Sequence, residues 1–266
     1  MEFAAFADNA REIEAEPADL EIVALVTDLF ERADTDLATI ARFLQGRVFP
    51  AHDSTTLDIG PNLCYEAIAR AAGRNVSADD VESRLADVGE IGEVAASYEF
   101  GGQQGLGAFT GNGPDGLTVS EVDDELRTLA AVEGSGSQDT KLDILFGLFN
   151  RADPDEARYL ARLVLSEMRI GVGEGTVRDA IAEAFDVPVA AVARALQVSN
   201  DYGLVADVAR DEGEDGLASL HLEIGRPVQA MLAQAGTVAD ALDAWDQAAV
   251  SWKFDGARIQ VHYDGD

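Results

Sequence analysis

The side chains best suited to covalent chemistry lie in the stretch SWKFDGARIQVHYDGD, residues 251–266. Lys253 stands out there because the sequence holds 19 basic side chains against 50 acidic ones, and only two of the basic residues are lysines. Asp255 and Gly256 are typical of a two-residue hairpin turn. In such a hairpin Lys253 pairs with Arg258 across the strands, so we expect two cations side by side.

Two cations at this spacing favour an anion between them. Directly opposed residues of a hairpin have Cβ atoms about 4.5 to 5.5 Å apart, and like charges placed so are destabilising. A phosphate would relieve the repulsion between Lys253 and Arg258. We also expect Arg258 to lower the pKa of the Lys253 amine and so make it a nucleophile near neutral pH, a role that a permanently protonated arginine cannot take. The alternative is an exposed lysine on a hairpin whose Asp-Gly serves only the turn.

The elements that must position this site are mainly helical. From about residue 18 to 210 apolar positions recur three and four apart, which predicts amphipathic helices. Thr118 with Glu121 predicts a capping box, and Asp153 with Pro154 predicts another helix start. The second of these helices is expected to bury a stripe of Leu160, Leu163, Val164 and Met168. A further helix from near Ser137 is expected to bury Leu142, Leu145, Phe146 and Phe149.

The pattern changes after about residue 215. The segment GRPVQAMLA carries a proline that breaks a strand, a helix is expected over 238–245, and the last stretch alternates apolar and polar residues. We place a boundary between residues 211 and 225. The predicted fold is therefore mainly α, with an all-helical domain over 1–215 and the incomplete start of an α+β domain over 216–266.

A second candidate site is the glycine-rich stretch RIGVGEGTV (169–177). Its three glycines allow close approach of a ligand, and a helix expected to begin near Thr176 would direct free N–H groups at an anion. Arg169 and Arg178 flank the stretch. The alternative is a flexible connector between helices.

The amino-acid composition limits which binding partners are expected. A formal charge of -31 and a pI near 4.1 argue against an ordinary nucleic-acid-binding surface. The scarcity of lysine instead favours a protein built for molar salt, where the screening length of about 3 Å leaves short contacts with a polyanion possible.

One cysteine, Cys64, and three scattered histidines predict no disulfide and no metal site of their own. No apolar run approaches the roughly 18 residues of a membrane span, so we expect a soluble, cytoplasmic protein.

The motif KFDGAR matches Lys-x-Asp-Gly-x-Arg, which marks the covalent nucleotidyltransferases, namely DNA ligases, RNA ligases and capping enzymes. Four further stretches resemble the ATP-dependent DNA ligases of archaea and eukaryotes, in the order of that family. They are GEIGEVA (89–95), GSGSQDTK (134–141), EARYLARLVLSEMRIGVGEGTVRDAIA (156–182) and RPVQAMLA (226–233). The resemblance thus covers nearly the whole chain.

This resemblance implies a nick-sealing chemistry. Lys253 would attack the α-phosphate of ATP to form lysyl-AMP, and magnesium would shield phosphate charge. Arg258 would hold the nucleotide, while Asp255 and Gly256 would shape the loop around the lysine. Ser251 stands where relatives usually carry a glutamate, and serine can hydrogen-bond to the nucleotide but cannot supply the charge.

The helical part resembles the DNA-binding domain of the family, and the implied partner is nicked double-stranded DNA. The residues carried over to that contact are Lys141, Arg169, Gly171, Gly173, Gly175, Thr176 and Arg178. For Lys141 a solvated lysine beside a helix cap is an equal alternative. The resemblance also makes a sliding clamp a candidate partner and a monomer the expected state.

Family members continue through further nucleotide-binding motifs, metal-binding carboxylates and an oligonucleotide-binding fold. None of these is in the sequence, so the 266 residues alone are expected not to complete ligation. Two alternatives stay open: a non-catalytic helical DNA-binding module, and an RNA ligase or capping-type nucleotidyltransferase.

Overall fold

The computed structural model describes residues 1–100, 116–229, 235–245, 247–252, 255–257 and 259–265, and this part of the chain is mostly helical. Its elements are α1 (Phe3–Ala15), α2 (Asp19–Glu31), the short 3-10 helix η1 (Asp34–Asp36), α3 (Leu37–Phe43), α4 (Pro61–Ala72), α5 (Ala78–Val88), α6 (Ile91–Ala96), α7 (Val119–Ala130), α8 (Ser137–Arg151), α9 (Pro154–Val164), α10 (Glu174–Ala184), α11 (Val189–Ser199), α12 (Tyr202–Ser219) and α13 (Val238–Ala244).

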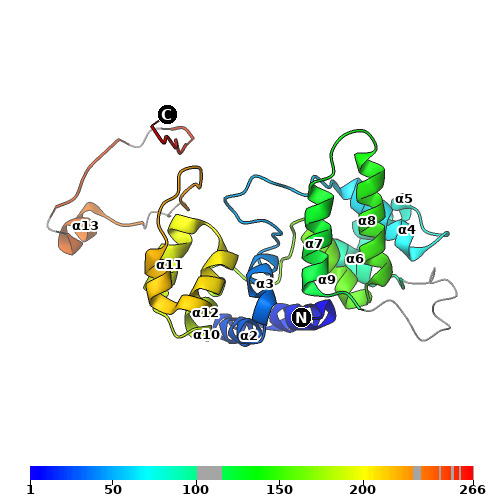
Figure 1. Cartoon of the computed structure of the whole chain (residues 1–266), viewed down its shortest axis with the longest axis horizontal. Helices are drawn as coiled ribbons and strands as arrows, with labels where there is room; N and C mark the ends of the chain where they lie inside the picture. The colour runs from blue at the N-terminus through cyan, green and yellow to red at the C-terminus, as the bar shows by residue number, and fades with distance from the viewer. Residues whose placement is uncertain (101–115, 230–234, 246, 253–254, 258, 266) are drawn as a thin grey trace.

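The helices form an elongated body whose neighbours are often far apart in sequence. Helices α10 to α12 lie at one end, α4 to α8 lie at the other, and α1 to α3 lie between them (Figure 1). Helix α6 packs on α9, α2 on α10, α4 on α8 and α3 on α12. The start of the chain is tied to the segment before α7, since Phe3 N–H donates to the Leu117 carbonyl at 2.7 Å. No described helix is both long enough and apolar enough to span a bilayer.

The local helix signals in the sequence are confirmed. Thr118 and Glu121 form the capping box of α7, and Asp153 accepts from the N–H of Glu156 at the start of α9. Helix α8 begins at Ser137, and α13 begins after a capping box at Thr237. Along α8 Leu145 and Phe149 are buried as predicted, whereas Leu142 and Phe146 are only partly buried.

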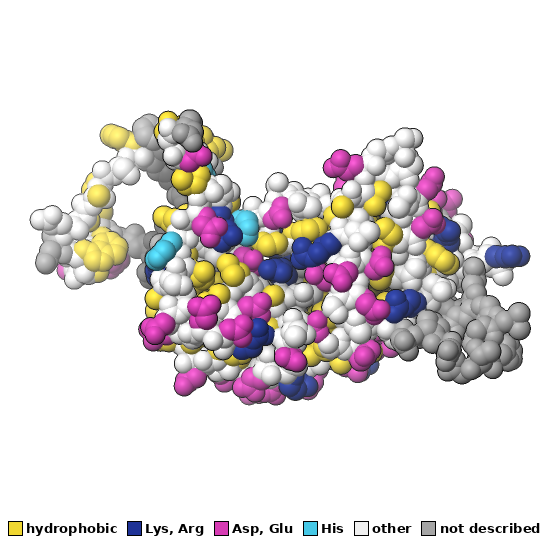
Figure 2. Space-filling model, in the orientation of Figure 1, with side chains coloured by type: hydrophobic (Ala, Val, Ile, Leu, Met, Phe, Trp, Pro, Cys, Tyr) yellow, Lys and Arg dark blue, Asp and Glu magenta, His cyan; other side chains and the backbone are white. Residues whose placement is uncertain are grey.

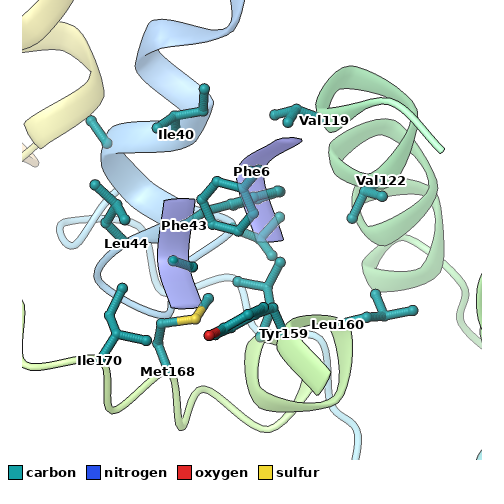
Figure 3. Packing of buried hydrophobic residues seen from close by; sticks show 14 of the residues in the cluster. Phe6, Ile40, Phe43, Leu44, Val119, Val122, Tyr159, Leu160, Met168 and Ile170 are labelled. Atoms are coloured by element: carbon teal, nitrogen blue, oxygen red, sulfur yellow. The ribbon is translucent and has the colours of Figure 1, made fainter. Parts of the chain in front are cut away.

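The predicted stripe of α9 is wrong in one residue. The helix ends at Val164, and Ser166 has a left-handed backbone with φ +56°, so Met168 follows in a loop and is not on the helix. Met168 is buried nevertheless. Figure 3 shows it with Ile170 beside Leu44 and below Phe43, so the loop after α9 inserts two apolar side chains into the core.

The centre of the core joins helices from separate parts of the sequence. Phe6 of α1 and Phe43 of α3 meet edge to face, with ring centroids 5.9 Å apart, and Tyr159 of α9 lies close to them (Figure 3). Aromatic pairs in this geometry add about 0.5 to 1.5 kcal/mol beyond the burial of their surface. The loop after α9 is therefore built on a rigid base.

The end of the chain differs from the alternating pattern expected of it. No strand is present in the described residues of 247–265, and Ile259, Val261 and Tyr263 are exposed. The predicted hairpin itself rests on residues 253, 254 and 258, which lie outside the described residues. Instead the side chain of Gln260 bonds both backbone groups of Val228, at 2.9 and 2.7 Å.

The helical body continues slightly past the predicted end of the first domain. Helix α12 extends to Ser219 across a kink at Gly213, and Leu217 is still buried. This end lies inside the predicted boundary interval of 211–225. The division into two domains itself stays a prediction.

Candidate nucleic-acid interface

The loop between α9 and α10, residues 165–173, is here called the glycine loop. Three of its residues have left-handed backbones: Ser166 at φ +56°, Arg169 at φ +50° and Gly171 at φ +78°. Glycine takes this conformation freely, whereas a side chain there is strained, so Gly171 relieves strain that Ser166 and Arg169 bear. Gly173 and the following Gly175 are different, because a Cβ added at either would meet nothing within 4 Å. Their backbones are open to an approaching ligand.

A hollow of about 560 Å³ runs along the glycine loop. Its wall is completed by Leu44 and Gln45, which follow α3, and it reaches Glu174 at the start of α10. The side-chain nitrogen of Gln45 is buried and has no hydrogen-bond partner in the described part of the chain. A buried donor without a partner is costly, and this nitrogen is too deeply buried to be reached from the hollow.

Helix α10 begins earlier than the sequence indicated. Its N-cap is Gly173 and its first residue is Glu174, so Thr176 lies within the first turn and is not the start. No side chain caps this end. The N–H groups of Glu174, Gly175 and Thr176 therefore lack partners within the helix and carry the positive end of its dipole. This arrangement can bind an anion such as a phosphate.

The charged side chains around this helix end are mixed in sign. Arg169 is 64% exposed and pairs with Glu167 at 3.0 Å, while Arg178 pairs with Asp179 at 2.7 Å. Exposed pairs of this kind contribute about 0 to 1 kcal/mol. Both arginines can thus exchange a carboxylate for a phosphate at small cost. Glu174 opposes an anion, but its carboxylate accepts a hydrogen bond from Gln229 at 2.8 Å.

A buried arginine, Arg162, contacts the backbone of the glycine loop. The guanidinium of Arg162 is 3% exposed and donates to both carboxylates of Glu14 and Glu90 at 2.8 to 3.1 Å. It also donates to the Met168 carbonyl at 3.4 Å. Burial tends to raise the pKa values of Glu14 and Glu90, but hydrogen bonds, with those of Arg162 the strongest, and the charge of Arg162 outweigh it and leave both pKa values lowered. The network joins α1, α6 and α9 to the loop.

None of the predictions from the sequence included this ion network, although one feature of the sequence indicates a buried charge. In the sequence Arg162 stands between Ala161 and Leu163, within the apolar stretch of α9. A charged residue on a buried stripe requires a partner of opposite charge. The two partners lie 148 and 72 residues away in the sequence, so spacing alone could not identify them.

Lys141 has a different environment from the solvated lysine considered above. Its side chain is buried in α8 and its amine donates to the carbonyl of Leu57 at 2.9 Å, with the Asp58 carboxylate at 3.5 Å. The helix end near it is capped by Gly136 without a side-chain hydrogen bond. Contact of Lys141 with DNA stays a prediction, and it would require the amine to leave these oxygens.

The candidate residues near the end of the chain are only partly described. Ser251, Asp255 and Gly256 are exposed. Lys253 and Arg258 lie outside the described residues, and so does their predicted pairing. In the part of the chain that the structure covers, no group of three His, Cys, Asp or Glu side chains could hold a metal ion.

A family model described as "DNA ligase N terminus" matches residues 2–182, which include helices α1 to α9, the Arg162 network, the glycine loop and most of α10. The chain belongs to this DNA ligase family. Two loops that the resemblance singled out, around Glu90 and around Gly171, both lie inside the matched region and both contact Arg162 or the hollow.

Individual relatives agree with the family match. A DNA ligase of Haloarcula marismortui is 75% identical over 268 residues, covering all of this chain and 48% of the relative. A DNA ligase of Haloferax volcanii is 68% identical over 293 residues, covering all of the chain and 50% of the relative. A DNA ligase of Archaeoglobus fulgidus is 40% identical over 268 residues, or 47% of its length. The chain thus spans about half the length of the curated relatives it matches.

Proposed function

We propose that this chain is part of an ATP-dependent DNA ligase that seals nicks in duplex DNA. The observation that carries the proposal is the DNA ligase family match over residues 2–182, together with relatives of that name that match the entire chain. The motif Lys253-x-Asp255-Gly256-x-Arg258 supports a covalent route. An RNA ligase or capping enzyme is disfavoured because the matched helical region belongs to DNA ligases.

In the proposed reaction the Lys253 amine attacks the α-phosphate of ATP and pyrophosphate leaves, forming a phosphoramidate bond to AMP. The 5′-phosphate at the nick then attacks this AMP and releases the lysine. Finally the 3′-hydroxyl attacks the 5′-phosphate, AMP leaves, and a phosphodiester bond closes the strand. Arg258 would bind the nucleotide, Ser251 would contact it by hydrogen bonding, and Asp255 with Gly256 would shape the loop.

The helical body would supply the grip on nicked duplex DNA. The exposed N–H groups at the start of α10, together with Arg169 and Arg178, would contact backbone phosphates. The acidic charge of the chain is compatible with this role in concentrated salt, because screening over about 3 Å at 1 M leaves short contacts intact. A salt-adapted host fits both this composition and the relatives found.

ATP and magnesium are proposed as the cofactors of the whole polypeptide, and a sliding clamp as a further partner. Since the described residues supply no cluster that could hold a divalent cation, we derive no step through the metal. A monomer in the cytoplasm is the proposed state and location.

The test is a nick-sealing assay with the whole polypeptide, ATP and magnesium in concentrated salt. We expect sealing by the wild type and none by Lys253→Ala. Residues 1–266 alone are expected to bind nicked duplex without sealing it. Binding with no sealing by any longer polypeptide would favour the alternative of a non-catalytic DNA-binding module.

A further inference from the structure

Arg47 differs from most arginines of this acidic chain. Eleven described arginines pair with a carboxylate, and others donate to hydroxyl, amide or backbone oxygens. The side chains of Arg47 and Arg74 are exposed and make neither a hydrogen bond nor an ion pair within the described residues. With 50 acidic side chains in the sequence, two guanidinium groups left without a carboxylate are available to an external anion.

Arg47 is placed directly beside the glycine loop. Gly46 before it has φ +67°, and a Cβ there would lie 3.4 Å from Met168 and 3.5 Å from the backbone of Ser166. A second hollow, of about 160 Å³, is lined by Arg47 and shares Ser166 with the larger hollow described above. The two hollows therefore meet at Ser166.

The segment that follows Arg47 is anchored by contacts with two other parts of the body. Arg127 of α7 donates to the Val48 carbonyl at 2.8 Å and stacks on the Phe49 ring at 5.0 Å. Nearer the other end of the body, His52 Nδ1 lies 3.4 Å from the Asn200 carbonyl. Arg47 thus projects from an anchored backbone, which lowers the entropy lost when its side chain binds.

The charges of Arg47 and Arg178 both influence the pKa of Tyr202. Burial raises the pKa of Tyr202 to about 12, and among the smaller influences Arg178 and Arg47 both lower it. The two guanidinium groups, one on α10 and one after α3, therefore lie within electrostatic reach of the same hydroxyl. Figure 2 shows basic side chains in the middle of one face, between the end with α11 and the end with α7 and α8, while acidic side chains spread around them.

We propose that Arg47 is a DNA-binding residue that contacts a backbone phosphate next to the one held by the glycine loop and α10. This inference rests on the proposed function. The planar guanidinium can donate two parallel hydrogen bonds to a phosphate, and no internal ion pair must be broken first. The DNA would then be held by two separate segments of the chain on one surface.

The test compares Arg47→Gln, Arg47→Lys and Arg74→Gln with the wild type. Arg74 is the matched control, because it is equally free of partners but lies in the turn between α4 and α5, at the opposite end of the body from α10 to α12 (Figure 1). Dissociation constants for a nicked duplex are measured by fluorescence anisotropy over a series of salt concentrations. Thermal unfolding of each variant checks the fold.

One lost phosphate contact lowers the slope of log affinity against log salt by about 0.9. We expect this decrease for Arg47→Gln, little change for Arg47→Lys and none for Arg74→Gln, with equal unfolding temperatures throughout. An unchanged slope in Arg47→Gln, or an equal decrease in Arg74→Gln, would overturn the contact while leaving the proposed function intact. Absence of duplex binding by the wild type would overturn both.

Discussion

Replacement of Arg162 by methionine tests whether the buried ion network supports both the fold and the glycine loop. The substitution keeps a long unbranched side chain but removes four hydrogen bonds to Glu14 and Glu90, at 2.8 to 3.1 Å. Removing one partner of a buried ion pair costs about 3 to 5 kcal/mol, since it leaves an uncompensated charge. The two carboxylates are 31% and 22% exposed and can recover some water, so we expect the lower end of this range, about 3 kcal/mol.

For a folded unit of this size a loss of about 3 kcal/mol lowers the unfolding midpoint by about 6 to 12 °C. The assay is thermal unfolding followed by circular dichroism at constant salt. Arg158→Met is the control on the same helix, because Arg158 pairs with one carboxylate only, that of the 48% exposed Glu93 at 3.1 Å, and should cost clearly less than Arg162→Met. A loss in Arg162→Met no larger than that of the control would refute the reasoning.

Three further outcomes follow from the same geometry. Gly175→Ala should raise the free energy of unfolding by up to about 1 kcal/mol, because its Cβ meets no atom within 4 Å. The same substitution should weaken duplex binding, and unchanged binding in an anisotropy titration would argue against phosphate contact at the start of α10. The folded pKa values of Glu14 and Glu90 are lowered, so their stabilising contribution is complete above pH 4.5 and is lost as the pH falls through the folded values. A pH series of unfolding midpoints should show this decline in the wild type and a flatter curve in Arg162→Met. Lys141→Met should lower the unfolding free energy by about 1 to 3 kcal/mol by removing a buried donor; a smaller salt slope for DNA at unaltered stability would instead support a phosphate contact.

Helix starts could be predicted from the sequence because their chemistry is local. Thr118 with Glu121, and Asp153 with Pro154, satisfy the first N–H groups of a helix from within four residues. The end of α9 had no such signal. The chain leaves the helix through a left-handed Ser166 with no glycine or proline nearby, and so Met168 was placed on the wrong element.

Only the part of the candidate interface that depends on local sequence could be predicted. The glycines around Gly171 stand out in the sequence, but the wall of the hollow formed by Gln45 comes from a distant segment. Lys141 precedes the apolar run of α8 and its buried amine bonds a carbonyl 84 residues away. Contacts of this range depend on how helices pack, which periodicity within one helix does not specify.

The measurement that tests the proposed function most directly is covalent labelling of the whole polypeptide with ATP carrying a radioactive α-phosphate, in the presence of magnesium. We expect label on the wild type that resists denaturation, and none on Lys253→Ala or on Lys253→Arg, whose guanidinium stays protonated. Labelling of either variant to the level of the wild type would contradict the assignment of Lys253 as the nucleophile.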